Sequence, residues 1–201
     1  MIRLGVLISG SGSNLQAIID AIQAGTLDAK IVLVISSKSD AYGLIRAYEA
    51  GIPTMSLTPE AYRDPLQADI IIAQALQSAG ADYVAMAGYM RMIHHPILEA
   101  FPRRVINIHP ALLPSFKGAH GIIDAYEAGV KVTGVTIHFV NAEYDEGPII
   151  AQRAVIVEET DTLERLEEKI HAIEHELYPH VLQLIASGLV TIDTEGKVHI
   201  G

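Results

Sequence analysis

An asparagine and a histidine two residues apart, in the stretch NIHPALLP, are the side chains of this sequence best suited to chemistry. Asn107 and His109 stand at the end of an apolar run, 105–108, that is typical of a buried strand. Because side chains alternate along a strand, both would lie on one face of the sheet. An amide donor beside an imidazole can stabilise the oxyanion that forms during acyl transfer. Taken alone, the pair fits a capping residue and a core residue equally well.

An aspartate in a later turn could complete this pair. Asp145 lies in YDEGP, between the strand-like runs GVTIHFV and PIIAQRAVIV. A carboxylate that reached the imidazole from this turn would keep the ring cationic. The alternative is a turn-forming aspartate that precedes Gly147 for conformational reasons alone.

A loop of small residues, SGSGSN at 9–14, predicts a binding site for a phosphate. It joins the apolar run Ile2–Ile8 to a helical pattern, and free amides at a helix N-terminus bind anions. The loop does not fit a dinucleotide site, since Leu15 replaces the third small residue and no acid follows Ile35 until Asp40. It also lacks the lysine of an ATP-binding loop. We therefore expect a phosphorylated substrate, with an ordinary tight turn as the alternative.

The elements that would position these residues alternate between strands and helices, which predicts an α/β fold with a parallel sheet. The helix 14–24 has an apolar stripe, and we expect Ser13 to cap it with Gln16 in a capping box and Gly25 to end it. After about residue 130, two further strands precede a long helical pattern at 162–187 and a small hairpin near Gly196. The first predicted strands are Ile2–Ile8, 31–35, 83–87 and 105–108.

Composition limits the classes of protein to consider. The chain has 201 residues, a formal net charge of −10 and no cysteine, which excludes disulfides and thiol chemistry and argues against nucleic acid as a partner. No apolar run approaches the roughly 20 residues of a membrane span. His171 and His175 have metal-ligand spacing without a third ligand, so we expect no metal. We expect a single cytoplasmic domain, 1–201, that acts on small molecules as a monomer or homodimer.

Four motifs in sequence order carry a resemblance to a known family: SGSGSN, MAGYMRMI, NIHPALLPSF and HFV followed by DEGPIIAQ. Together they resemble the glycinamide ribonucleotide formyltransferases, folate-dependent enzymes of purine synthesis, over residues 1–190. The resemblance implies a Rossmann-like formyltransferase fold. It also implies transfer of a formyl group from 10-formyltetrahydrofolate to the amine of 5'-phosphoribosylglycinamide. Residues 1–100 would then form the ribonucleotide-binding half and residues 101–190 the catalytic and folate-binding half.

The resemblance assigns roles to particular residues. The catalytic residues would be Asn107, His109 and Asp145. The ribonucleotide would be bound by Gly12, Ser13, Asn14 and Glu174. The folate would be bound by Met90, Arg91, Met92 and Ile93, together with Asn107 and Asp145. Thr136 and His138 lie at positions of the family's active-site wall, and Arg63 would replace an arginine that many members carry where this chain has Pro59. The sequence around His120 also departs from the common family form.

Other readings of the same motifs remain open. Formyltetrahydrofolate deformylase shares the three polar residues but carries a regulatory domain before the catalytic sheet, whereas this sequence starts at the sheet and has Pro110 after His109. Methionyl-tRNA formyltransferase needs an added tRNA-binding domain. A non-catalytic nucleotide-binding module on the same fold is the remaining alternative, and the intact set of Asn107, His109 and Asp145 argues against it.

Overall fold

The computed structural model describes residues 1–201 and is built on a seven-stranded sheet in the order β3-β2-β1-β4-β5-β6-β7. Strands β1 to β5 are parallel, and β6 and β7 are antiparallel to their neighbours. The strands are β1 (Ile2–Ile8), β2 (Ala29–Ser36), β3 (Thr54–Ser56), β4 (Tyr83–Met86), β5 (Val105–His109), β6 (Val132–Phe139) and β7 (Ile149–Ile156). A separate hairpin pairs β8 (Val190–Ile192) with β9 (Val198–Ile200).

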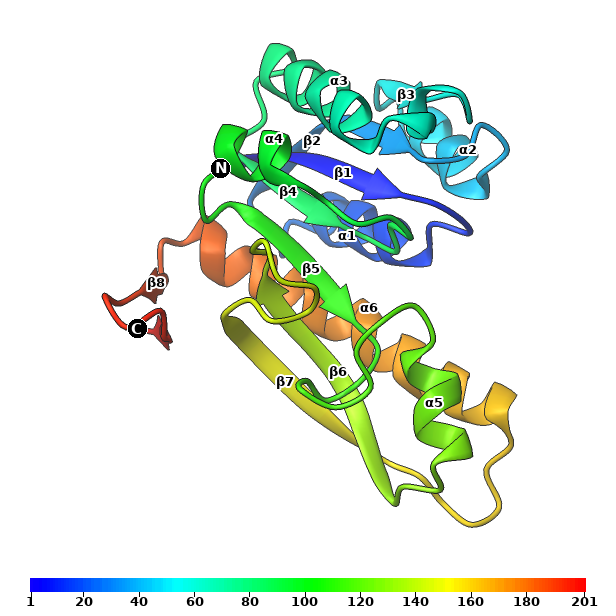
Figure 1. Ribbon diagram of the computed structural model, residues 1–201. Coiled ribbons are helices and arrows are strands. Elements are labelled where there is room, and N and C mark those ends of the chain that lie inside the picture. The colour runs from blue at the N-terminus through cyan, green and yellow to red at the C-terminus, as the bar shows by residue number, and fades with distance from the viewer.

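Helices cover both faces of the sheet (Figure 1), as the sequence predicts. One face carries α1 (Ser13–Gln23), α2 (Tyr42–Glu49) and the longest helix, α6 (Leu163–Ala186), against which α5 (Gly121–Glu127) packs. The other face carries α3 (Pro65–Ser78), α4 (His95–Ala100) and the short 3-10 helix η1 (Ala61–Arg63). The core on the α6 side includes residues of both halves of the chain, from Leu4 to Ile185. None of the helices combines the length and the apolar character that a membrane crossing requires.

The predicted strands, the long C-terminal helix and the terminal hairpin are confirmed. The two runs after residue 130 pair with each other and also extend the main sheet through β5. Strand β3 was not predicted, because its three residues lie at the sheet edge and none of them is buried. Short edge strands carry little apolar pattern.

The predicted capping box at α1 is wrong. Gly12 is the N-cap residue, with φ 71°, and Ser13 is already helical with no side-chain cap hydrogen bond. The Gly12 carbonyl accepts from the Gln16 amide, while the Gln16 side chain contacts Asp20 and Arg46. A left-handed glycine turns the chain into the helix without a side-chain acceptor, so the first amides stay free for a ligand.

A buried tyrosine fastens α6 to the sheet. Tyr178 is completely buried, and its hydroxyl lies 3.0 Å from the carbonyl oxygens of both Met86, the last residue of β4, and Ile106, the second residue of β5. Burial raises its pKa well above the ordinary value. The hydroxyl therefore stays protonated and donates to the backbone of the two neighbouring strands.

We expect Tyr178→Phe to lower the free energy of unfolding by about 1–2 kcal/mol, because two buried carbonyls lose their donor while the ring still packs. Urea denaturation would show a lower midpoint at an unchanged slope. Tyr48→Phe is the matched control, since Tyr48 is 80% exposed. Equal midpoints for the parent and Tyr178→Phe would contradict this expectation.

The strand order reverses between β1 and β4, so the connections that leave their carboxyl ends run to opposite sides. In open α/β sheets such a reversal opens the crevice in which ligands bind. The loop 9–14 follows β1 and the segment 87–94 follows β4. The topology therefore brings the predicted phosphate loop and the predicted folate segment to the same crevice.

Candidate active site

A cavity of about 420 Å³ opens at this end of the sheet. Its wall combines the loop 9–14, the ends of β4 and β5, the start of α5, one side of α6 and the turn that carries Asp145. A smaller cavity of about 40 Å³ lies between the segment after β4 and the 140–145 loop. Asn107, Tyr144 and Asp145 line both cavities, which therefore meet at these residues, whereas His109 lines the larger cavity alone.

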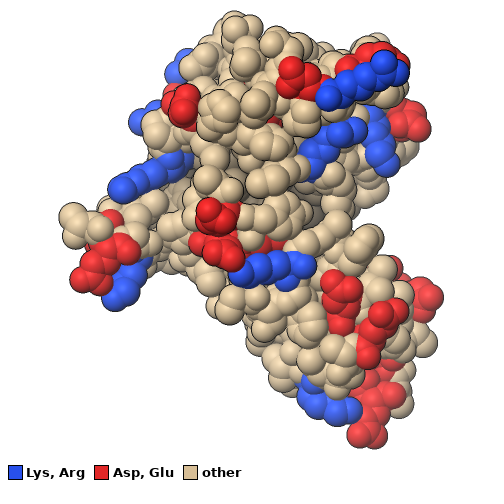
Figure 2. Space-filling view, viewed as in Figure 1, with Lys and Arg blue, Asp and Glu red and all other residues tan.

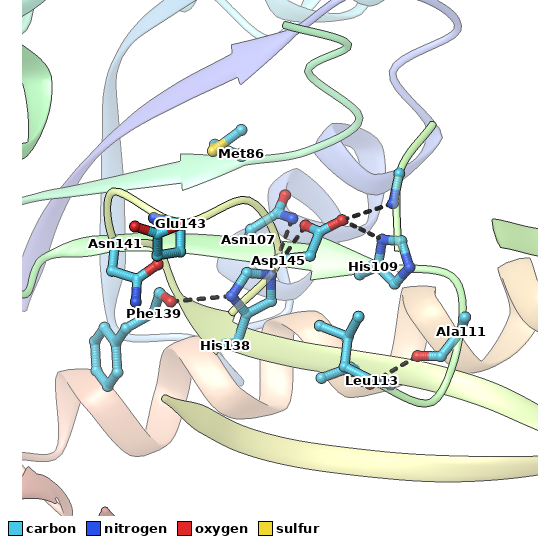
Figure 3. A network of polar contacts seen from close by, with 12 residues as sticks. Met86, Asn107, His109, Ala111, Leu113, His138, Phe139, Asn141, Glu143 and Asp145 are labelled. Carbon is cyan, nitrogen blue, oxygen red and sulfur yellow. Dashed lines mark hydrogen bonds and ion pairs between the residues drawn. The ribbon is translucent and has the colours of Figure 1, made fainter. Parts of the chain in front are cut away.

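The three predicted catalytic side chains converge there (Figure 3). Asp145 Oδ2 lies 3.6 Å from His109 Nδ1, and Asp145 Oδ1 lies 3.7 Å from His138 Nε2. The side chains of His109 and Asp145 are only 4% and 6% exposed. Both separations are too long for hydrogen bonds. They are short enough for a strong electrostatic interaction, because these side chains are shielded from water. The carboxylate therefore acts electrostatically on two imidazoles at once.

His109 faces acceptors on both sides of its ring. Nε2 donates to the Phe116 carbonyl oxygen at 2.8 Å, and Nδ1 faces the Asp145 carboxylate. A neutral imidazole carries one donor and one acceptor, whereas the cation carries two donors. Nε2 therefore carries a hydrogen, and Nδ1 is the ring atom that faces the carboxylate charge.

The imidazole of His138 is held in a different way, with a backbone acceptor at one nitrogen and an amide donor at the other. Its Nδ1 donates to the Phe139 carbonyl oxygen at 2.9 Å, and its Nε2 lies 3.2 Å from Asn107 Nδ2. Burial is the main cause that lowers the pKa of His138, and the neighbouring His109 lowers it further. A neutral ring leaves Nε2 free to accept from the Asn107 amide. This bond uses one amide hydrogen of Asn107 and leaves the second for a ligand.

Two glycines hold the Asp145 turn in place. The Gly118 amide donates to Asp145 Oδ2 at 2.9 Å, which ties the loop after β5 to the turn. A Cβ on Gly147 would lie 1.7 Å from the Phe139 carbonyl oxygen, so only glycine fits there. Asp145 itself has φ 54°, in the left-handed region that aspartate and asparagine tolerate better than most residues.

The predicted phosphate loop lines the larger cavity beside the N-terminus of α1. A Cβ on Gly12 would lie 2.5 Å from the Gly43 Cα, so the glycine also permits close approach of α2. Lys38, in the loop after β2, lines the same cavity and was missed in the sequence. The rule that ligands bind at the carboxyl ends of parallel strands could have found it.

Glu174 projects from α6 into the same cavity and is only 4% exposed. Its Oε2 accepts from Asn14 Nδ2 at 3.0 Å and lies 2.9 Å from His171 Nδ1. The hydrogen bond to Glu174 is the largest cause that raises the pKa of His171. Glu174 therefore joins α6 to the predicted phosphate loop in the cavity wall.

The predicted folate residues divide between the two cavities. Met90 lines the larger cavity, whereas Arg91, Met92 and Ile93 line the smaller one. The Arg91 guanidinium carbon lies 3.8 Å from the centroid of the Tyr62 ring. This cation–π contact holds the arginine against η1.

Two of the remaining predicted residues lie outside both cavity linings. Arg63 ends η1 and lines neither cavity. Thr136 is fully buried, and its hydroxyl donates to the Ala111 carbonyl at 2.7 Å and accepts from the Leu113 amide at 3.0 Å. It supports the loop after β5 rather than the cavity surface, whereas His138 lines the smaller cavity and His120 the larger one.

Charge on the visible surface is dispersed. On the face in Figure 2, Lys and Arg lie scattered among acidic side chains, and acidic groups gather near α5, which carries the exposed Asp124 and Glu127. A broad basic field is therefore absent from this face, and the positive groups of the cavity are local ones, Lys38 and the free amides of α1.

Known proteins are similar to this chain in sequence and in fold. The family model described as "Formyl transferase" matches residues 2–182. The phosphoribosylglycinamide formyltransferase of Bacillus subtilis is 39% identical over 183 residues, which are 91% of this chain and 94% of that protein. The crystal structure of glycinamide ribonucleotide transformylase 1 from Symbiobacterium toebii has a TM-score of 0.96 and 50% identity, covering 100% of this chain and 94% of that one.

Longer proteins contain a similar region. The trifunctional purine biosynthetic protein adenosine-3 of Bos taurus is 43% identical over 196 residues, which are 98% of this chain but 19% of that protein. This chain thus spans about a fifth of the length of that relative. With a family model that matches residues 2–182 and a relative of similar length at 39% identity, the chain belongs to the formyl transferase family.

Proposed function

We propose that the chain transfers the formyl group of 10-formyltetrahydrofolate to the amine of 5'-phosphoribosylglycinamide. The products are the N-formyl ribonucleotide and tetrahydrofolate, in the biosynthesis of purines. The observation that carries the proposal is the convergence of Asn107, His109 and Asp145 in the wall of the larger cavity, which shares Asn107 and Asp145 with the smaller one. The names of the relatives from Bacillus subtilis and Symbiobacterium toebii support it.

The ribonucleotide fits the larger cavity. Its phosphate would bind the amides of Gly12, Ser13 and Asn14, with Lys38 nearby, and Glu174 would face the remainder of the molecule. The pterin of the folate would lie against residues 90–93, beside the smaller cavity. Residues 1–100 then provide the ribonucleotide-binding half, and residues 101–190 provide the catalytic residues and the opposite folate wall.

The reaction needs stabilisation of one oxyanion and movement of one proton. As the amine nitrogen forms a bond to the formyl carbon, the second amide hydrogen of Asn107 and the cationic His109 stabilise the negative oxygen. The bond from that carbon to the folate nitrogen then breaks. The proton that the amine loses passes to the folate nitrogen, and the Asp145 carboxylate relays it through water while keeping His109 charged.

The setting of the reaction is also part of the proposal. We place the enzyme in the cytoplasm, where it acts on small molecules as a monomer or homodimer. The donor set at the cavity junction, two imidazoles, one amide and one carboxylate, suits oxyanion stabilisation and proton transfer. No metal takes part in the proposed steps.

An absorbance assay of 10-formyltetrahydrofolate tests this function. Consumption of the folate only in the presence of 5'-phosphoribosylglycinamide supports the transferase. Consumption without the ribonucleotide would instead identify a deformylase. No consumption under either condition would identify a non-catalytic binding module.

Replacing Lys38 tests the placement of the phosphate. We expect Lys38→Met to raise the KM for the ribonucleotide about tenfold to hundredfold, the loss expected for one charge-assisted hydrogen bond, while the KM for the folate stays unchanged. Lys30→Met is the matched control, because Lys30 stands at the opposite end of β2. Equal rises in both KM values would count against the placement. Gly12 is unsuitable for this test, since any side chain there meets the Gly43 backbone.

A further inference from the structure

The segment that carries the proposed folate residues, 88–94, has neither helical nor strand structure of its own. It connects β4 to α4 and forms one wall of the smaller cavity through Arg91, Met92 and Ile93. Such a segment depends on contacts with its surroundings for a fixed conformation. We call it the donor-side segment.

A buried carboxylate holds the end of the donor-side segment. Asp69 lies within α3 and is only 3% exposed. Its Oδ2 accepts from the backbone amide of His94 at 2.6 Å and lies 3.1 Å from His94 Nδ1. Burial raises the pKa of Asp69, and the hydrogen bonds from His94 oppose that effect. A carboxylate that is buried among apolar side chains is unfavourable unless it has hydrogen-bond partners of this kind.

A buried hydroxyl holds the start of the segment. Ser9, at the end of β1, is 3% exposed, and its Oγ accepts from the Met90 amide at 2.8 Å. The same oxygen lies 2.6 Å from Ser37 Oγ, after β2. Between the two ends, the hydroxyls of Tyr62 and Tyr89 lie 3.2 Å apart. The donor-side segment is thus held by polar groups from β1, η1 and α3.

We propose that Asp69 is a positioning residue for the formyl donor, acting through His94 on the donor-side segment. This inference rests on the proposed function, because it assigns the pterin to residues 90–93. Asp69 lines neither cavity, so its effect would be confined to how well the segment is placed. The alternative is that Asp69 merely stabilises the start of α4, for which His94 is the N-cap residue.

Steady-state kinetics of Asp69 variants separate these roles. We expect Asp69→Ala to raise the KM for 10-formyltetrahydrofolate about tenfold, the equivalent of one buried hydrogen bond, with kcat and the ribonucleotide KM within about twofold of the parent. Asp69→Asn keeps an acceptor for the His94 amide, so its folate KM should rise less. The asparagine variant also keeps the test possible should the alanine variant fail to fold.

A second variant in the same helix provides the control. Asp64 caps α3, and its Oδ1 accepts from the Gln67 amide at 3.1 Å. Asp64→Ala weakens α3 without touching the donor-side segment, so its folate KM should stay at the parent value. A change at Asp69 that lowers thermal stability like Asp64→Ala but leaves the folate KM unchanged would overturn the proposal. If the parent protein itself showed no formyl transfer, the proposed function would be overturned instead.

Discussion

Replacing His109 with alanine is expected to lower kcat for formyl transfer by at least about 10²–10³-fold, the usual cost of removing one oxyanion donor. The ring lines the larger cavity, with an acceptor facing each nitrogen, so under the proposed mechanism the variant loses a donor to the oxyanion. The KM values should change much less than kcat, because the phosphate loop and the donor-side segment are built from other residues. Single-turnover and steady-state assays of formyl transfer would measure the loss.

The fold should survive this change. His109 is the last residue of β5, and its backbone pairing with Thr136 does not depend on the imidazole. Circular dichroism and thermal unfolding would verify this, with His180→Ala as the control for loss of an exposed imidazole from α6. Near-normal turnover by His109→Ala would remove His109 from the mechanism.

Alternation along the chain was sufficient to predict the first part of the site. Asn107 and His109 line the same cavity because both belong to β5 and point to one side of it. The loop 9–14 could also be located, since a strand followed by small residues and a helix is a local pattern. Both features depend only on residues that are close together in the sequence, which is why the sequence predicts them.

Contacts between distant segments were beyond the reach of such patterns. The hydrogen bond between Asn14 and Glu174 depends on how α6 packs against α1, and the bond between Asp69 and His94 depends on how α3 packs against α4. Lys38 enters the cavity only because β2 lies next to β1. The sequence shows each of these as an isolated polar residue, since strand order is a property of the whole fold.

Asp145 was found from a local pattern but is placed by contacts between distant segments. Its replacement tests the mechanism more selectively than that of His109. The motif YDEGP predicted a turn, yet the turn reaches the imidazoles only because β6 and β7 extend the sheet beside β5. We expect Asp145→Asn to lower kcat by at least about 10²-fold, because a neutral amide no longer stabilises the cationic His109 or relays the proton. Pre-steady-state measurement of formyl transfer would show the loss in the chemical step.

Asparagine is the right replacement because it isolates the charge. It tolerates the left-handed conformation of Asp145, φ 54°, and its carbonyl oxygen can still accept from the Gly118 amide, whereas alanine would add backbone strain. Glu146→Gln removes the same charge from the next residue of the turn, where the carboxylate pairs with Lys117 at 2.7 Å and is 53% exposed. An exposed pair contributes little, so this control should keep kcat within about threefold. If both variants lost activity equally, the charge of the whole turn, rather than the carboxylate between the two imidazoles, would govern the reaction.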